Sequence, residues 1–205
     1  SDEDNILLLV CDGIGGHHRG DLASTSCCRN MVTAWKRDKA GSIDTPKKMG
    51  VFLTNCIQAA NSSLHEQNNQ LGVNNPMGTT VVCAAVMKFH IVACHAGDSR
   101  LYRLRGDSLE QLTCDHSVVQ ELVNRKLMTP EQARNHPLSH VISRSIGPTQ
   151  EVLPEVNVYE RQPGDRLLLC SDGLTLHVKD QMIQNILKTS STPRDAIDEL
   201  MKQAL

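Results

Sequence analysis

Three aspartates share one local pattern, because each stands beside a glycine at the end of a short apolar run: Asp12, Asp98 and Asp172. An ionised carboxylate at the end of a buried strand costs several kcal/mol unless a positive charge compensates it. Cationic residues are few nearby, with Arg100 beside Asp98 and Arg19 well past Asp12. Carboxylates and backbone carbonyls are the ligands that hard cations such as Mg²⁺ and Mn²⁺ prefer. Each Asp-Gly pair alone predicts a turn; the three together, with the residues around them, favour a cation site.

The elements that must position these aspartates can be read from hydrophobic periodicity. Short apolar or alternating runs predict strands over 6–11, 79–87, 89–96, 99–105, 109–112, 155–161 and 166–171. Helices are predicted over roughly 22–35, 49–64, 178–189 and 193–205, and the polar stretch 117–134 is also expected to be helical. Strands in meander order, with helices grouped before and after them, favour antiparallel sheets covered by helices.

Composition bounds the class of protein. The chain has 205 residues, of which 40% are hydrophobic, with 21 Lys and Arg, 23 Asp and Glu, and a formal net charge of −2. These values predict one folded domain over 1–205 and exclude a disordered chain. The chain has few aromatic residues: one Trp, two Tyr and two Phe. This low number argues against nucleic-acid binding, which needs a basic patch and stacking rings.

Localisation signals and zinc spacings are not found in the sequence. No run approaches the roughly 20 apolar residues that cross a bilayer, and the acidic stretch 1–5 does not fit a secretory signal. Several of the eight cysteines lie inside apolar runs, where a free thiol behaves as a small hydrophobe. We therefore expect reduced thiols, a cytoplasmic protein and no membrane association. The adjacent pairs at 17–18 (His-His) and 27–28 (Cys-Cys) lack the spacing of a zinc site.

Six short pieces carry a resemblance to a known family. They occur in one order along the chain: VCDGIGGH at 10–17, MGTT at 77–80, GDSR at 97–100, LTCDHS at 112–117, VISRSIG at 141–147 and GDRLLLCSDGL at 164–174. In these pieces the sequence resembles the metal-dependent protein serine/threonine phosphatases of type 2C (PPM family), most closely the bacterial members. The resemblance implies an α+β fold, a four-layer α-β-β-α sandwich of two antiparallel β-sheets flanked by helix pairs. It also implies a two-metal centre at one edge of the sandwich.

The resemblance also implies roles for individual residues. Asp12 would bridge two Mn²⁺ or Mg²⁺ ions, the carbonyl of Gly13 would ligate one of them, and Asp172 would ligate a metal from the opposite sheet. Asp98, with Asp172, would hold a weaker third ion. Paired divalent ions about 3.5–4 Å apart activate a water and neutralise the phosphate, so Asp12 and Asp172 are the expected catalytic residues. The expected partner is a phosphorylated protein of a Ser/Thr kinase pathway, acted on by a monomer.

The remaining matched residues have weaker assignments. Gly15 and Gly16 fit a tight turn better than a phosphate cradle, and 77–80 is expected to be structural. His17, His18 and His116 are candidates for proton donation, although exposed loop histidines and a helix start explain them as well. Ile14 stands where some relatives of this family carry a histidine, so no general acid is evident. The polar segment 117–145 matches the variable flap of the family, which is expected to be mobile and to select substrates.

Two pieces of the family pattern are not found. An Arg followed by Asn-Glu-Asp is not found before 6–11, and Asp-Asn-x-Thr does not occur near residue 205, so we expect a domain truncated at both ends. An active phosphatase and a catalytically inactive pseudophosphatase that binds phosphoproteins or a regulator both remain open. Three retained aspartates favour the enzyme. A phosphatase of a sigma-factor pathway would differ only in its substrate.

Overall fold

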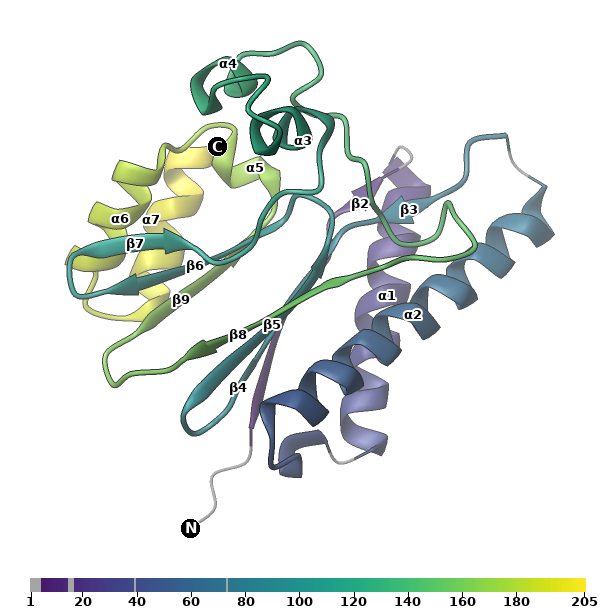
Figure 1. Cartoon of the computed structure of the whole chain (residues 1–205), viewed down its shortest axis with the longest axis horizontal. Helices are drawn as coiled ribbons and strands as arrows, with labels where there is room; N and C mark the ends of the chain where they lie inside the picture. Colours follow the sequence, from purple (N-terminus) through teal and green to yellow (C-terminus); the bar gives the residue numbers. More distant parts are fainter. Residues whose placement is uncertain (1–4, 15–16, 39, 73) are drawn as a thin grey trace.

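The structure is a computed structural model that describes residues 5–14, 17–38, 40–72 and 74–205. Its strands and helices follow one another along the chain as labelled in Figure 1. The strands are β1 (Ile6–Val10), β2 (Gly13–Ile14), β3 (Gly78–Thr79), β4 (Val81–Val86), β5 (His90–Ala96), β6 (Arg100–Arg105), β7 (Ser108–Gln111), β8 (Glu155–Glu160) and β9 (Arg166–Cys170). The helices are α1 (His17–Arg37), η1 (Ala40–Ser42), α2 (Pro46–Leu71), α3 (Val118–Asn124), α4 (Pro130–Arg134), α5 (Asp172–Thr175), α6 (Asp180–Thr189) and α7 (Pro193–Ala204).

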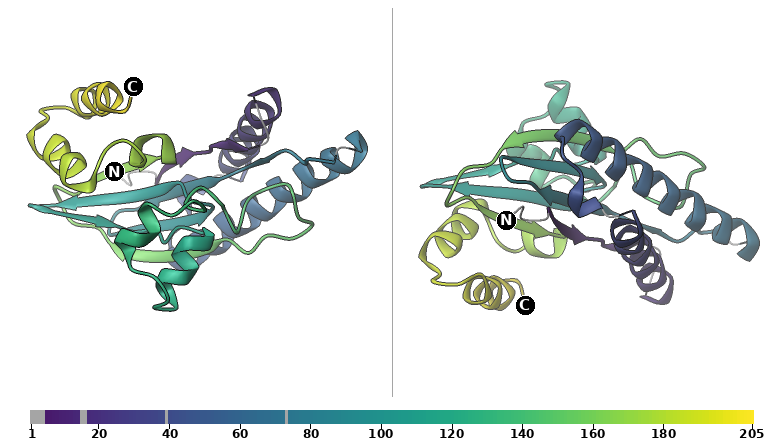
Figure 2. Two further views of the ribbon diagram at one scale, coloured as in Figure 1. Left: turned by 90° about the horizontal axis from the view of Figure 1, so that it is seen from above. Right: turned by 90° about the horizontal axis from the view of Figure 1, so that it is seen from below.

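Two antiparallel sheets form the middle of the molecule. One has the strand order β1-β4-β5-β8 and the other the order β7-β6-β9, while β2 and β3 make a short separate pair. Helices α1 and α2 cover the first sheet, and α6 and α7 cover the second, on opposite sides of the molecule (Figures 1 and 2). The predicted α-β-β-α sandwich is therefore confirmed.

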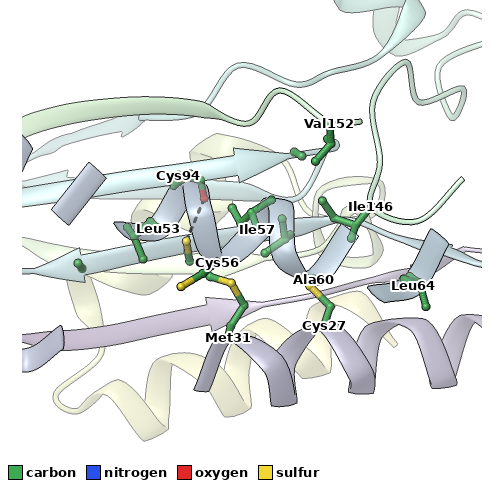
Figure 3. Close-up of a cluster of buried hydrophobic side chains, with 14 of the residues drawn as sticks. Cys27, Met31, Leu53, Cys56, Ile57, Ala60, Leu64, Cys94, Ile146 and Val152 are labelled. Atoms are coloured by element: carbon green, nitrogen blue, oxygen red, sulfur yellow. Dashed lines mark hydrogen bonds between the residues drawn. The ribbon is translucent and has the colours of Figure 1, made fainter. Parts of the chain in front are cut away.

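The central strands are buried on both faces, which explains their continuous apolar runs. Along β4, Val81, Cys83 and Ala85 pack in the cluster beneath α1 and α2, whereas Val82 and Ala84 pack in the cluster between the two sheets. Figure 3 shows the first cluster, in which Cys27 and Met31 of α1 meet side chains of α2 and of the sheet. A third cluster joins the second sheet to α6 and α7.

The cysteines contribute to these cores as thiols. All eight are free, and four of them, Cys27, Cys56, Cys83 and Cys94, belong to the cluster beneath α1 and α2. Cys83 and Cys94, two of the cysteines inside apolar runs, are fully buried in this cluster and act there as small hydrophobes, as expected. Among the described helices, none is long and apolar enough to cross a membrane.

Helix α2 shows why the sequence pattern predicted it well. Thr45 accepts a hydrogen bond from the Lys48 backbone N–H at 3.3 Å, and Pro46 occupies the first turn, where a missing N–H costs nothing. The helix ends at Gly72, whose φ of 58° is easy for glycine. Its buried stripe, at helical spacing, includes Met49, Leu53, Cys56, Ile57, Ala60 and Leu64.

Several predicted boundaries are wrong, among them the end of α2, which runs to Leu71 and not to 64. The single helix expected over 117–134 is two short helices, α3 and α4, because Lys126 takes a positive φ of 60° and Thr129 caps a new helix at Pro130. Helix α1 begins at His17, five residues earlier than expected. The strand expected over 79–87 is interrupted at Thr80, which lies between the end of β3 at Thr79 and the start of β4 at Val81.

Candidate metal centre

One cavity of about 390 Å³ brings the predicted site residues together. Asp12, Gly13, Asp98 and Asp172 all line it, so the four residues assigned from the sequence lie at one place. The remaining lining residues are Ile14, Thr80, His140 and Ile142. His140 and Ile142 come from the segment 117–145, called the flap below, which therefore borders the site.

The three aspartates reach the cavity from both sheets. Asp12 follows β1 and Asp98 follows β5, two strands of the first sheet, whereas Asp172 follows β9 of the second sheet and opens α5. Strands that are distant in sequence thus end at the same edge of the sandwich. This is how the pattern of an aspartate after an apolar run becomes a cluster of carboxylates.

A network of backbone and hydroxyl groups fixes Asp12. Its N–H donates to Thr80 Oγ1 at 3.0 Å, and its carbonyl accepts from the Thr80 N–H at 2.8 Å and from Thr79 Oγ1 at 2.8 Å. The Thr80 hydroxyl lies 2.7 Å from the Ser99 hydroxyl, next to Asp98. The piece 77–80 is structural, as predicted, because it ties the segments of two site aspartates together.

Two glycines permit close backbone approaches around the site. A Cβ on Gly13 would lie 2.1 Å from the Gly20 carbonyl oxygen in α1, so the chain can pass the helix there only as glycine. Gly97 has a φ of 117°, and a Cβ on it would lie 2.7 Å from Thr80 Cβ. Both positions need glycine for space, and Gly97 also needs it for its backbone conformation.

The carboxylates in the cavity repel one another. Burial, followed by the charge of Asp172, raises the pKa of Asp12. Burial, with Asp172 and Asp115 nearby, raises the pKa of Asp98 to about 6. Among the described residues that line the cavity there is no Lys or Arg. The donor set therefore has an excess of negative charge, which suits a divalent cation bound by oxygen ligands.

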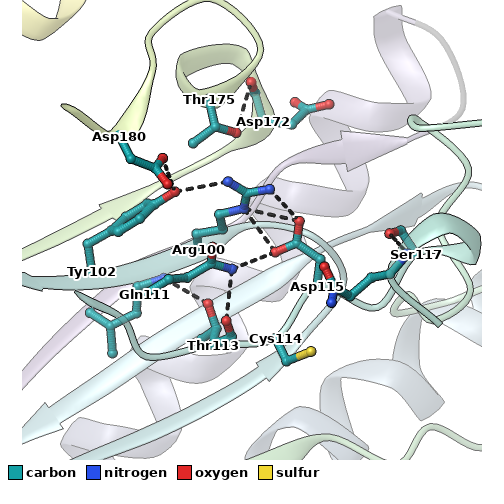
Figure 4. A network of polar contacts seen from close by, with 12 residues as sticks. Arg100, Tyr102, Gln111, Thr113, Cys114, Asp115, Ser117, Asp172, Thr175 and Asp180 are labelled. Atoms are coloured by element: carbon teal, nitrogen blue, oxygen red, sulfur yellow. Dashed lines mark hydrogen bonds and ion pairs between the residues drawn. The ribbon is translucent and has the colours of Figure 1, made fainter. Parts of the chain in front are cut away.

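Arg100 does not compensate these charges, although it is only two positions from Asp98. Its Nε lies 2.9 Å and 3.0 Å from the two Asp115 carboxylate oxygens, and its Nη2 donates to Asp115 at 2.7 Å. Its Nη1 donates to Tyr102 Oη at 2.9 Å, and the Tyr102 hydroxyl donates to Asp180 (Figure 4). The nearest guanidinium is therefore held by a carboxylate outside the cavity lining.

The family of the chain follows from a comparison with family models. All residues 1–205 match the model described as Protein phosphatase 2C. The chain belongs to the protein phosphatase 2C family.

Named relatives of this phosphatase 2C chain are bacterial. It is 36% identical over 198 residues to the serine/threonine phosphatase stp of Listeria innocua serovar 6a, covering 97% of this chain and 78% of the relative. It is 33% identical over 198 residues to the protein phosphatase PhpP of Streptococcus pneumoniae serotype 2, covering 97% and 79%.

Solved structures agree with the fold and include a metal-bound form. The serine/threonine phosphatase Stp1 from Staphylococcus aureus has a TM-score of 0.88 at 35% identity, covering 98% of this chain and 78% of that one. The Mycobacterium tuberculosis phosphatase PstP/Ppp has a TM-score of 0.85 at 32% identity, covering 100% and 86%. The catalytic domain of PstP in complex with two manganese ions has a TM-score of 0.82 at 29% identity, covering 100% and 86%. Members of this family depend on metal ions, in line with the carboxylate cluster.

A second cluster of metal-ligand types lies outside the cavity, at His95, His116 and Glu155. The two imidazole rings stack with centroids 4.5 Å apart and an interplanar angle of 4°, so their in-plane lone pairs cannot converge on one ion. The Gly97 N–H donates to His116 Nδ1 at 3.2 Å, and the Arg144 guanidinium lies 3.0 Å from His116 Nε2. A cationic side chain thus already fills this place. His116 is a structural residue that joins Gly97 to the start of α3.

Burial also keeps this histidine pair neutral. It lowers the pKa of His95, and, with His95 and Arg144 adding to it, lowers the pKa of His116 to about 4. His116 is therefore a poor proton donor near neutral pH. The side chains of His17 and His18, and residues Gly15 and Gly16, lie outside the described part of the chain.

The sequence did not identify His140 and Ile142 as site residues. His140 lies in a turn over 137–140 and Ile142 in an isolated bridge to Ser117, so no regular spacing links the two residues. Nothing in the polar flap sequence shows which of its histidines reaches the aspartates, because that depends on how the flap packs.

Proposed function

We propose that this phosphatase 2C chain hydrolyses phosphoserine and phosphothreonine esters in proteins, using water activated by divalent cations. The observation that carries the proposal is the convergence of Asp12, Asp98 and Asp172 on one cavity whose described lining has no Lys or Arg. Family membership and the named relatives support the same chemistry.

The donor set fits Mn²⁺ or Mg²⁺. Asp12 would bridge two ions, with the Gly13 carbonyl and Asp172 as further ligands, and Asp98 with Asp172 would hold a weaker third ion. Ions bound there lower the pKa of a water and neutralise charge on the phosphate. The raised pKa values of Asp12 and Asp98 support this assignment, because they show carboxylates that lack a positive partner.

The chain's own residues hold this donor set rigid. Thr79 and Thr80 fix the backbone of Asp12, and Ser99 connects that network to the segment of Asp98. Asp115 keeps the Arg100 guanidinium away from the carboxylates. Ligands that are already in place bind ions without a further free-energy cost of rearrangement. Charges fixed in this way stabilise the charge that develops in the transition state.

The substrate approaches beside the flap. Because His140 and Ile142 line the cavity, we propose that the flap contacts the phosphorylated protein and contributes to its selection. We further propose a substrate of a Ser/Thr kinase pathway, a monomeric enzyme and a cytoplasmic location. The free thiols of all eight cysteines support a reducing compartment.

A binding protein without activity is not favoured by any observation on the described residues. A pseudophosphatase has no physical need to keep three mutually repelling carboxylates, whose burial costs free energy in the absence of cations. We therefore do not propose that function.

The test is hydrolysis of p-nitrophenyl phosphate as Mn²⁺ is titrated, using the protein in its full natural length. Wild type should turn over substrate only with metal, and both Asp12→Asn and Asp172→Asn should lower the rate by more than about 100-fold, the upper range for partners that merely orient metal ligands. Asp107→Asn is the matched control, since the Asp107 carboxylate is exposed and, in the described contacts, pairs with Lys188. Equal, metal-independent rates for all four proteins would refute the proposed function.

A further inference from the structure

The flap places one histidine in the wall of the aspartate cavity. His140 lines the cavity together with Asp12, Asp98 and Asp172, and it is the only histidine in the described lining. The aspartates follow strand ends, whereas His140 and Ile142 form the part of the lining contributed by the flap. A titratable side chain of a second chemical type therefore borders the same space as the carboxylates.

Backbone contacts hold the chain directly after this histidine, whose own side chain is exposed. The Val118 N–H donates to the Val141 carbonyl at 3.0 Å, and Ser117 and Ile142 form an antiparallel bridge. The Ser143 N–H donates to the His116 carbonyl at 2.9 Å. The stretch that carries His140 is thus paired with the start of α3 directly after it.

The same contacts connect that stretch to the segment of Asp98. The His116 N–H donates to the Gly97 carbonyl at 3.0 Å, and the Gly97 N–H donates to His116 Nδ1 at 3.2 Å. Gly97 directly precedes Asp98 in the chain. A short series of hydrogen bonds therefore connects the segment directly after His140 to the segment of a site aspartate.

Other lining residues offer no free proton donor. The three aspartates belong to the proposed metal centre, and the Thr80 hydroxyl is engaged by the Asp12 N–H and the Ser99 hydroxyl. Ile14 and Ile142 are apolar, and Gly13 has no side chain. Within the described lining, the imidazole of His140 is the one group left that can deliver a proton to a substrate.

We propose that His140 protonates the serine or threonine oxygen as it leaves the phosphorus atom, an inference that rests on the proposed function. The attacking water loses one proton to solvent, and the bond from its oxygen to phosphorus forms while the bond from phosphorus to the ester oxygen breaks. The electron pair of the broken bond stays on the ester oxygen, which takes a proton from the His140 imidazolium. The neutral imidazole then regains a proton from water.

The placement of His140 suits this role. In an in-line displacement the leaving oxygen lies on the face of phosphorus opposite the attacking oxygen. A water held at the carboxylates attacks from their side, so the leaving oxygen faces away from them. His140 is the titratable group that the flap adds to the same cavity. An alkoxide is a poor leaving group, and a positioned acid contributes about 10²–10⁴-fold to such steps.

Substrates that differ in leaving group test the proposal. We would measure kcat for a phosphoserine peptide, p-nitrophenyl phosphate and a series of substituted phenyl phosphates, at saturating Mn²⁺ and in the protein's full natural length. His140→Gln removes the dissociable proton and keeps a polar side chain. It should lower kcat for the phosphoserine peptide by about 10²–10³-fold and leave p-nitrophenyl phosphate almost unchanged, because nitrophenolate leaves without a proton. Across the series of phenyl phosphates, log kcat of the His140→Gln variant should fall more steeply with the basicity of the leaving group than log kcat of wild type.

His136→Gln is the matched control within the flap. Its ring accepts a hydrogen bond from the Leu138 N–H at 3.1 Å and does not line the cavity. This variant should leave the ratio of the two rates as in wild type. If His140→Gln lowers both rates equally, or leaves the peptide rate unchanged, His140 is not the acid and the proposal is overturned. If wild type itself shows no Mn²⁺-dependent turnover of either substrate, the proposed function has failed instead.

Discussion

Arg100 directs its guanidinium to Asp115 and not to Asp98, which is only two positions away. Two of its nitrogens reach the Asp115 carboxylate at 2.7–3.0 Å, and both side chains are largely buried. The arrangement keeps a fixed positive charge from neutralising the aspartate cavity. It thereby leaves the three carboxylates available for cations.

The first prediction concerns this ion pair. Asp115→Ala should leave the Arg100 guanidinium buried without its partner and lower the free energy of unfolding by about 3–5 kcal/mol. The released guanidinium should also compete with metal near Asp98 and weaken Mn²⁺ activation. Urea denaturation and an Mn²⁺ titration of activity measure the two effects. Asp198→Ala, which breaks the exposed pair with Arg194, should cost no more than about 1 kcal/mol. Equal losses for the two variants would contradict this prediction.

The second prediction concerns Asp98 in the metal-free protein. Because its pKa is raised to about 6 by burial and by the nearby Asp172 and Asp115, its ionised form destabilises the fold near neutral pH when no cation is bound. Asp98→Asn should therefore raise the free energy of unfolding by about 1–2 kcal/mol in excess chelator, after allowance for partial exposure. The variant should gain less stability than wild type from added Mn²⁺. A metal-free variant that is less stable than wild type would contradict this reading.

The third prediction concerns Gly13. Gly13→Ala would place a Cβ 2.1 Å from the backbone oxygen of Gly20, and neither backbone can move without displacing β2 or α1. We expect a loss of about 3–5 kcal/mol in the free energy of unfolding, measured by thermal and urea denaturation. Gly106→Ala is the comparison, since its φ of 56° is strained for alanine but nothing lies within 4 Å of the new atom. That variant should lose only about 1 kcal/mol, and a similar loss for both would show that space around Gly13 does not matter.

The fourth prediction concerns pH and His116. Its pKa is lowered from 6.5 to about 4, so the folded protein keeps it neutral while the unfolded chain takes up a proton below about pH 6.5. The stability that depends on neutral His116 is present above that pH and is lost as the pH falls toward 4. Between about pH 7.5 and about pH 5, the stability advantage of wild type over His116→Gln should shrink by about 2 kcal/mol. An advantage that stays constant across this range, measured by urea denaturation, would contradict it.

Local sequence signals predicted much of the fold. The continuous apolar runs of β4 and β5 predicted buried strands, and the helical spacing of apolar residues over 49–64 predicted the middle of α2. The break between α3 and α4 also had a local signal, because Thr129, Pro130 and Gln132 form a capping box. That signal lay within a polar stretch with little periodicity, and for this reason one helix was predicted instead of two.

The site could be predicted only in part. The repeated pattern of an aspartate after an apolar run identified Asp12, Asp98 and Asp172, because strand ends of a sandwich meet at one edge. The partner of Arg100 and the place of His140 depend on how β6, the loop to α3 and the flap pack together. Such contacts between distant segments have no signal in the spacing of residues along one chain.

The most direct test of the central claim is phosphate release from a phosphoserine peptide while Mn²⁺ is titrated, comparing wild type with Asp12→Asn. The account predicts that wild type saturates with Mn²⁺ and loses its activity in chelator. It predicts that Asp12→Asn lowers kcat/KM by more than about 100-fold at every Mn²⁺ concentration. Activity that persists in chelator, or an Asp12→Asn variant as active as wild type, would contradict it.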